Sequence, residues 1–255
     1  MPHSLLIIGT DTDAGKTVAA CGIVAHLRLD RGINILPAKP VQTGCTRLAD
    51  GSLTAPDLDA HLDAAGLAAP PPHLLGLMSP YRFEPACSPH LAAAETGITV
   101  EPATIRDAMR ALADTCDGVV AETAGGLLTP LNPRGETMLD LARLLGWPVL
   151  LVAANRLGCI NHALLSLRAL AAAEIPVIGV LTSLVAPPSD DSLAAAIRRD
   201  NPRAIARFGG VPYLGQIPFL PHAAGRTPHW RTLTQDAPAL ARTLRTIFPV
   251  PPNIA

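Results

Sequence analysis

The chain has 255 residues, a length that suits one α/β domain with a sizeable hydrophobic core. Its 20 Lys and Arg residues against 21 Asp and Glu residues give a formal net charge of −1 without a basic cluster, which argues against nucleic acid or an anionic membrane as a partner. The hydrophobic fraction of 49%, with only 3% aromatic residues, indicates a core of Ala, Leu, Val and Ile.

Short apolar runs alternate with longer amphipathic segments, a pattern typical of repeated βα units and a parallel sheet. We predict strands at residues 5–8, 33–38, 119–122, 149–153, 177–181 and 213–217. We predict helices at residues 16–28, 57–65, 102–113, 137–145, 163–172, 192–198 and 237–246. The expected fold is α/β, a single-domain parallel sheet covered by helices on both faces.

Three proline-rich stretches interrupt this rhythm, at residues 69–72, 186–189 and 249–252. The first two are predicted to be loops within one domain, because the strand pattern resumes after each of them. We therefore expect one domain over residues 1–248 and a mobile tail over residues 249–255.

The five cysteines are scattered and contain no C-x-x-C pair, so we expect neither a zinc site nor a disulfide framework. The first predicted strand begins a few residues after Met1, and no apolar run reaches transmembrane length. The expectation is a cytoplasmic protein without a signal peptide or a membrane partner.

The most informative stretch runs from Gly9 to Thr17, with the sequence GTDTDAGKT, between the first predicted strand and the first predicted helix. Backbone N–H groups of such a loop converge on phosphate, its lysine (Lys16) reaches the β- and γ-phosphates, and the Thr17 hydroxyl is placed to bind Mg²⁺. A strict G-x-x-x-x-G-K-[ST] pattern requires glycine at Thr10, so the loop is a variant. We predict a P-loop NTPase-like fold whose loop binds nucleotide through Asp13, Ala14, Gly15, Lys16, Thr17 and Val18.

Chemically active residues also follow later strands, where ligands bind in open parallel sheets. Lys39 follows the second strand, and Pro40 keeps it at the sheet edge, where its charge would neutralise phosphate or another anion. Glu122 ends the third strand, at the expected place for a carboxylate that holds Mg²⁺ opposite Thr17. The glycines at 125 and 126 allow a ligand to approach the backbone closely.

The segment from Asn155 to His162 follows the fourth strand and leads into the predicted helix at Ala163. Its Gly158 and Asn161 could present free N–H groups to an anion such as a substrate carboxylate. Asn161 could instead simply cap the helix. Spacing alone leaves both interpretations open.

Several motifs longer than a bare nucleotide motif occur along almost the whole chain. They are Gly9-Thr10-Asp11-Thr12 leading to Gly15-Lys16-Thr17, Lys39-Pro40-Val41, Tyr81 with Ser88-Pro89-His90, Glu122 with Ala124-Gly125-Gly126 and Thr129-Pro130-Leu131, Leu157 to His162, and Leu214-Gly215 with Ile217-Pro218. In these motifs the chain resembles the dethiobiotin synthetase family. The resemblance implies an ATP-dependent ligase of biotin biosynthesis that closes a ureido ring on 7,8-diaminononanoate (7,8-diaminopelargonate) with CO₂, through a carbamate and its mixed anhydride with phosphate.

The resemblance also implies roles for individual residues. Lys16, Lys39 and Thr12 would act on the carbamate and the transferring phosphoryl group, and Thr43 would lie near the substrate. Thr17, Asp57 and Glu122 would surround Mg²⁺, with Asp59 as an alternative to Asp57. Further nucleotide contacts would come from Thr123, Ala124, Gly125, Ser183, Pro218, Phe219 and Leu220. The substrate carboxylate would be met, in a homodimer, by Gly158, Cys159, Ile160 and Asn161 of the opposite subunit.

The chain departs from the family pattern at three places. Thr123 stands where the family usually has Gly, Ser183 stands where an Asn usually contacts adenine, and no acid follows Leu220 at the usual place. These differences concern selection of the nucleotide base rather than the chemistry, so we expect ATP as co-substrate with other nucleoside triphosphates tolerated.

Two other classes of protein also contain a phosphate loop of this kind. A P-loop ATPase switch of the partitioning type would carry a second lysine early in the loop, where this chain has Thr10 to Ala14. An amidotransferase-like relative would need a glutaminase domain with a nucleophilic cysteine, for which 255 residues leave no room. The ring-closing ligase is therefore the preferred hypothesis.

Overall fold

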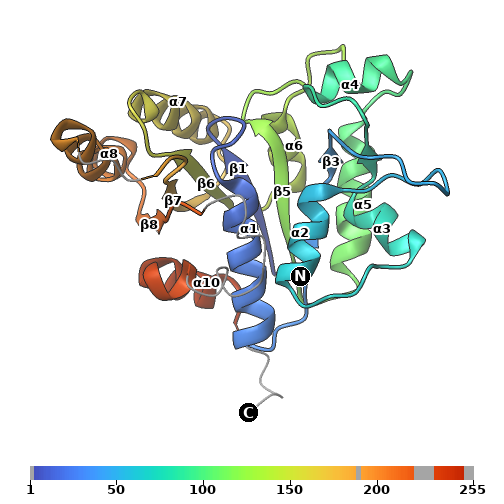
Figure 1. Ribbon diagram of the computed structural model, residues 1–255, viewed down its shortest axis with the longest axis horizontal. Coiled ribbons are helices and arrows are strands. Elements are labelled where there is room, and N and C mark those ends of the chain that lie inside the picture. The colour runs from blue at the N-terminus through green and yellow to red at the C-terminus, as the bar shows by residue number, and fades with distance from the viewer. Residues whose placement is uncertain (1–2, 188–190, 221–232, 250–255) are drawn as a thin grey trace.

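The computed structural model describes residues 3–187, 191–220 and 233–249, and its centre is a sheet of six parallel strands (Figure 1). In order across the sheet these are β2 (Ile35–Ala38), β5 (Gly118–Gly126), β1 (His3–Gly9), β6 (Val149–Ala154), β7 (Val177–Ser183) and β8 (Tyr213–Ile217). A separate pair of short parallel strands consists of β3 (Val41–Gln42) and β4 (Tyr81–Arg82). The predicted parallel α/β sheet is confirmed, and β1, which leads into the phosphate loop, lies in its interior.

Helices connect the strands. They are α1 (Lys16–Ala25), which continues into the π-helical turn η1 (His26–Asp30), α2 (Pro56–Ala64), α3 (Pro72–Met78), α4 (Pro89–Glu95), α5 (Pro102–Ala113), α6 (Met138–Leu145), α7 (Cys159–Ala172), α8 (Ser192–Gly209) and α10 (Pro238–Ile247). Five of them begin with proline, which suits a first helical turn because its missing N–H has no acceptor there.

Both faces of the sheet are covered, because successive side chains of each strand point to opposite sides. On β1, Leu5 and Ile7 lie in one buried cluster with residues of α1 and α10. Leu6 and Ile8 lie in a second buried cluster with residues of α5 and α6. A third cluster packs α7 and α8 against β6 and β7. The continuous apolar runs of the sequence thus reflect strands that are buried on both sides.

Some predicted boundaries were wrong. Strand β5 continues to Gly126, so Glu122 lies inside the strand rather than at its end; it is tolerated there because cationic partners neutralise it. Helix α7 begins at Cys159 with Gly158 as its N-cap residue, which excludes Asn161 as the cap. Helix α8 runs to Gly209 despite Pro202.

Other elements were not predicted at all. The short helices α3 and α4 and the strand pair β3–β4 arise in the segment between β2 and β5. Helix α3 begins at Pro72, the last residue of a predicted loop, where proline starts a helix instead of preventing one. Of the predicted mobile tail, residues 250–255 lie outside the described residues, as do residues 188 and 189 of the second proline-rich stretch.

Two glycines test how tightly β5 is held in the sheet. Gly118 is buried, and a Cβ there would overlap the carbonyl oxygen of His3 and contact Phe248, whereas a Cβ at Gly76 of α3 meets no atom within 4 Å. We expect Gly118→Ala to lower the free energy of unfolding by about 3 kcal/mol, because the neighbouring backbone must shift. Gly76→Ala should raise it by about 0.5–1 kcal/mol through helix propensity. Urea unfolding of both variants measures this, and equal stabilities would contradict the expected crowding.

Candidate functional site

A cavity of about 1090 Å³ opens at the carboxyl edge of the sheet, beside the phosphate loop. Most of the site residues predicted from the sequence line it, although they come from segments far apart in the chain. These are Thr12, Asp13, Gly15, Lys16, Thr17, Val18, Lys39, Thr43, Asp57, Glu122, Ala124, Gly125, Ser183, Pro218, Phe219 and Leu220. The structure therefore gathers the two lysines, the candidate metal ligands and the candidate base contacts around one space.

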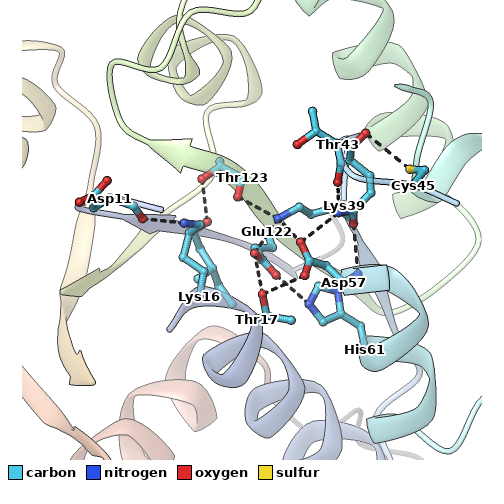
Figure 2. A network of polar contacts seen from close by, with 12 residues as sticks. Asp11, Lys16, Thr17, Lys39, Thr43, Cys45, Asp57, His61, Glu122 and Thr123 are labelled. Atoms are coloured by element: carbon cyan, nitrogen blue, oxygen red, sulfur yellow. Dashed lines mark hydrogen bonds and ion pairs between the residues drawn. The ribbon is translucent and has the colours of Figure 1, made fainter. Parts of the chain in front are cut away.

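The phosphate loop has the backbone conformation of an anion-binding helix start. Gly15 is the N-cap residue of α1 with φ of 95°, a conformation that favours glycine, and a Cβ there would overlap the Ser183 side chain. The N-terminus of α1 therefore opens toward the cavity with its positive dipole end. Lys16 folds back over the loop and donates from Nζ to the Asp11 carbonyl at 2.8 Å (Figure 2).

Lys16 is largely buried, and desolvation destabilises its charged form. Burial lowers the pKa of its ammonium to about 8, and the nearby charge of Lys39 adds to the effect, while Glu122 and Asp57 oppose it. A triphosphate bound beside Lys16 would supply the negative charge that this ammonium lacks. The charge of Lys16 and the N-terminus of α1 thus favour the binding of an anion at the loop.

A buried ion-pair network lies beside the loop (Figure 2). Lys39 Nζ lies 2.6 Å from Glu122 Oε1 and 2.8 Å from Asp57 Oδ2, and it also donates to the Thr123 carbonyl at 3.2 Å. The Thr17 hydroxyl is within hydrogen-bonding distance of both carboxylates, at 3.1 Å from Glu122 Oε1 and 3.2 Å from Asp57 Oδ1. Oxygens from the loop, α2 and β5 therefore converge on one point.

The network keeps its members ionised despite burial. Burial by itself would raise the pKa of Glu122, but Lys39 and the hydrogen bond from His61 outweigh it and hold that pKa at about 2. Burial also works against the charge of Lys39, yet the attraction of Glu122 and Asp57 prevails and raises its pKa. The site thus contains a carboxylate and an ammonium that remain charged at neutral pH.

The structure decides between the two aspartates of α2. Asp57 faces the lysine and the loop threonine in the large cavity. Asp59 instead accepts the Ala55 backbone N–H at 3.2 Å, near the start of the helix, and lines a smaller cavity of about 530 Å³. Asp57 is therefore the carboxylate available to the site.

Two network members were missed in the sequence. Gln42 exchanges hydrogen bonds with Asp57, donating to Oδ2 at 3.3 Å and accepting from its backbone N–H at 3.2 Å. His61 is fully buried, with Nε2 2.8 Å from Glu122 Oε2. The four-residue spacing from Asp57 to His61 puts both on one face of a helix, a signal that the sequence did offer.

Some predicted residues do not line the cavity. Ala14 is a fully buried residue of the loop, and the Thr123 hydroxyl donates to the Ile7 carbonyl at 3.2 Å. The Thr123 side chain therefore does not point into the cavity. The segment from Gly158 to Asn161 also lies outside the lining, at the start of α7.

Ser183 does line the cavity, at the end of β7, where it is 4% exposed and lies against Gly15. Its position is therefore close to the phosphate loop itself.

The converging oxygens fit a magnesium ion in their chemistry. Mg²⁺ prefers one or two carboxylates together with hydroxyl, water and phosphate oxygens, and Thr17, Asp57 and Glu122 offer such donors. Within the described ranges, no three His, Cys, Asp or Glu side chains form a cluster that could hold a metal by themselves. A metal here would depend on the threonine and on ligand oxygens.

Comparisons with known proteins identify the family of this chain. Residues 3–227 match the family model described as an AAA domain. The ATP-dependent dethiobiotin synthetase BioD of Aromatoleum aromaticum is 39% identical over 89% of this chain and 94% of its own length. The chain belongs to the dethiobiotin synthetase family. Relatives with the same name from Pseudomonas paraeruginosa and Halalkalibacterium halodurans are 39% and 34% identical, over 86% of this chain in each case and 91% and 86% of their own lengths.

Solved structures share the fold of this dethiobiotin synthetase family member. The septum site-determining protein MinD of Pyrococcus horikoshii, complexed with Mg-ADP, has a TM-score of 0.58 at 17% identity, over 97% of this chain and 96% of that chain. The cell division ATPase MinD of Pyrococcus furiosus has a TM-score of 0.55 at 17% identity, over 97% and 98%. These likenesses establish the P-loop architecture.

All five cysteines lie among the described residues and are free thiols. Among the described helices, none combines the length and apolar character needed to cross a membrane.

The buried network can be tested against an exposed ion pair. Glu122 is 1% exposed, whereas Glu84, paired with Arg47, is 43% exposed. Glu122→Gln should lower the free energy of unfolding, measured without Mg²⁺ or nucleotide, by about 3 kcal/mol, because Lys39 stays buried with less compensating charge. Glu84→Gln removes the same charge from the surface and should leave stability nearly unchanged. Similar losses in both variants would show that burial does not govern the pair.

Proposed function

We propose that this protein is an ATP-dependent dethiobiotin synthase that closes a ureido ring on 7,8-diaminononanoate with CO₂ and releases ADP and phosphate. The observation that carries the proposal is the cavity in which a phosphate loop, two lysines and converging acidic and hydroxyl oxygens meet, in a chain 39% identical to curated dethiobiotin synthetases. The relatives' name supplies the reaction, and this geometry meets its electrostatic demands.

The proposed chemistry runs through two intermediates, a carbamate and its mixed anhydride with phosphate. An amine of the substrate attacks CO₂ and loses a proton, which gives a carbamate. A carbamate oxygen then attacks the γ-phosphorus of ATP, ADP leaves, and the mixed anhydride forms. The neighbouring amine attacks the carbonyl carbon and loses a proton, phosphate leaves, and the five-membered ring closes. These steps require positive charge and alignment more than acid–base catalysis by side chains.

The chain's own residues would supply that charge and alignment. Lys16 would contact the β- and γ-phosphates from the loop, while Lys39 would stabilise the carbamate and the transferring phosphoryl group from the opposite side. Thr12 and Thr43 also line the cavity and would orient the carbamate and the substrate. Asp13, Ala14, Gly15 and Val18 would complete the phosphate cradle, the first three through backbone N–H groups.

Mg²⁺ is the proposed cofactor, with Thr17, Asp57 and Glu122 as the residues that would hold it. Bound there, it would neutralise charge on the phosphate oxygens. Thr123, Ala124, Gly125, Ser183, Pro218, Phe219 and Leu220 are the proposed remaining nucleotide contacts.

A homodimer is proposed because the segment predicted to bind the substrate carboxylate lies outside the cavity of its own chain. Gly158, Cys159, Ile160 and Asn161 would serve the partner's site. Two large apolar side chains flank this segment in the open: Leu157 is 79% exposed and Leu165 is 61% exposed. The proposed homodimer would cover these exposed apolar side chains. We also propose a cytoplasmic location, consistent with the free thiols.

Phosphate release decides between a ligase and an ATPase switch. We expect phosphate release from ATP only when both the diamine and bicarbonate are present, because the γ-phosphoryl group needs the carbamate as its acceptor. Omitting either compound should reduce release to the background of a control without enzyme. Equal release with and without the diamine would exclude the ligase and favour a switch.

The shared site can be tested by mixing two inactive variants. Lys39→Ala removes a residue of one chain's own cavity, and Asn161→Ala removes a residue offered to its partner. Each alone should lower the rate of ring closure on the order of 10²–10³-fold. Each mixed dimer would contain one doubly defective site and one intact site, so activity should return after subunit exchange. If exchange is demonstrated and activity stays absent, each site is built within one chain.

Base selectivity should be low. An amide side chain donates to and accepts from the adenine edge at once, whereas Ser183 has one hydroxyl and is packed against Gly15 of the phosphate loop. We expect CTP and GTP to support ring closure within about tenfold of ATP, a gap of roughly 1.4 kcal/mol. The measurement is kcat/KM for the four nucleoside triphosphates. A thousandfold preference for ATP would show that other residues select adenine.

A further inference from the structure

Glu122 divides its two carboxylate oxygens between different partners (Figure 2). Oε1 faces Lys39 at 2.6 Å and Thr17 at 3.1 Å, on the cavity side of the network. Oε2 lies 2.8 Å from Nε2 of His61, which comes from α2 and is fully buried. Because an ionised carboxylate only accepts hydrogen bonds, Nε2 is the donor in this contact.

The bond from His61 fixes the plane of the carboxylate. A carboxylate held at one oxygen turns about its terminal torsion, which is soft, whereas a donor on the second oxygen removes that freedom. With Oε2 tied to α2, Oε1 stays directed at Thr17 and at the cavity. Without His61, Oε2 would lose its hydrogen-bond donor in the interior, and a rotated carboxylate would turn Oε1 away from Thr17.

Packing alone does not account for a histidine at this place. The other ring nitrogen, Nδ1, is buried and has no hydrogen-bond partner among the described residues, which carries a desolvation cost. An apolar side chain would fill the same space between α2 and β5 without that cost. The presence of histidine at position 61 is therefore explained by its hydrogen bond to Glu122 and not by the space that the ring fills.

We propose that His61 is a positioning residue that orients Glu122 for a divalent cation bound with the nucleotide phosphates. The inference rests on the proposed function, in which Glu122 is a metal ligand. Groups that hold a ligating side chain from behind commonly change metal affinity or activity 10- to 100-fold when they are removed. His61 would act on affinity for the cation and not on the phosphate loop itself.

The test compares His61→Leu, which removes the donor, with His61→Gln, whose amide nitrogen reaches about as far as Nε2. Mg²⁺ is titrated calorimetrically into each full-length variant saturated with a non-hydrolysable ATP analogue, and analogue binding is measured separately in EDTA. We expect His61→Leu to weaken Mg²⁺ binding about 10- to 100-fold. Binding of the analogue in EDTA should stay within about twofold, and His61→Gln should recover most of the Mg²⁺ affinity.

Each outcome is informative. If His61→Leu and His61→Gln bind Mg²⁺ as the wild type does, or lose affinity equally while their melting temperatures fall, the positioning role is overturned. If His61→Leu does not fold, His61→Gln is compared with His61→Asn, whose amide is too short to reach Glu122, and equal Mg²⁺ affinities overturn the proposal. If the wild-type protein releases phosphate without the diamine, the proposed ligase function is refuted. If the wild-type protein is a ligase and His61→Leu binds Mg²⁺ as tightly as the wild type, only the role of His61 is refuted.

Discussion

The buried pairing of Lys39 with Glu122 is the interaction on which the site depends. Removing either partner would leave the other charge buried with less compensation, at a cost of about 3–5 kcal/mol, so each side chain stabilises the other. The pair joins the end of β2 to the interior of β5, and Asp57 of α2 joins it from a third element. The geometry of the cavity is thus set by charge neutralisation among three segments that are far apart in sequence.

The parallel sheet makes this meeting possible. Because β2, β5 and β1 are neighbours and run in one direction, the ends of β2 and β1 lie beside the middle of β5, so Lys39, Glu122 and the phosphate loop meet at the same edge. The interior of the sheet is almost purely aliphatic, which keeps the strands rigid and the dielectric low. Charged groups at that edge consequently interact more strongly than they would in water.

Burial gives the two lysines of the site different properties. Lys39 is surrounded by carboxylates that outweigh desolvation, and its pKa is raised. Lys16 belongs to the phosphate loop, where desolvation prevails and lowers its pKa to about 8. One lysine is thus neutralised by the protein itself, while the other lacks a counter-charge that a phosphate would provide. The same side chain serves two purposes because its surroundings differ.

The sequence by itself determined the fold class, the phosphate loop and most residues of the cavity, because hydrophobic periodicity and loop motifs are local signals. Local signals did not reveal that β5 continues past Glu122 or that α7 starts at Cys159, since buried partners and a glycine cap decided those boundaries. The choice of Asp57 over Asp59 and the contact of His61 with Glu122 depended on how α2 packs against β5. Such contacts arise from packing between distant segments, so only the tertiary structure could decide them.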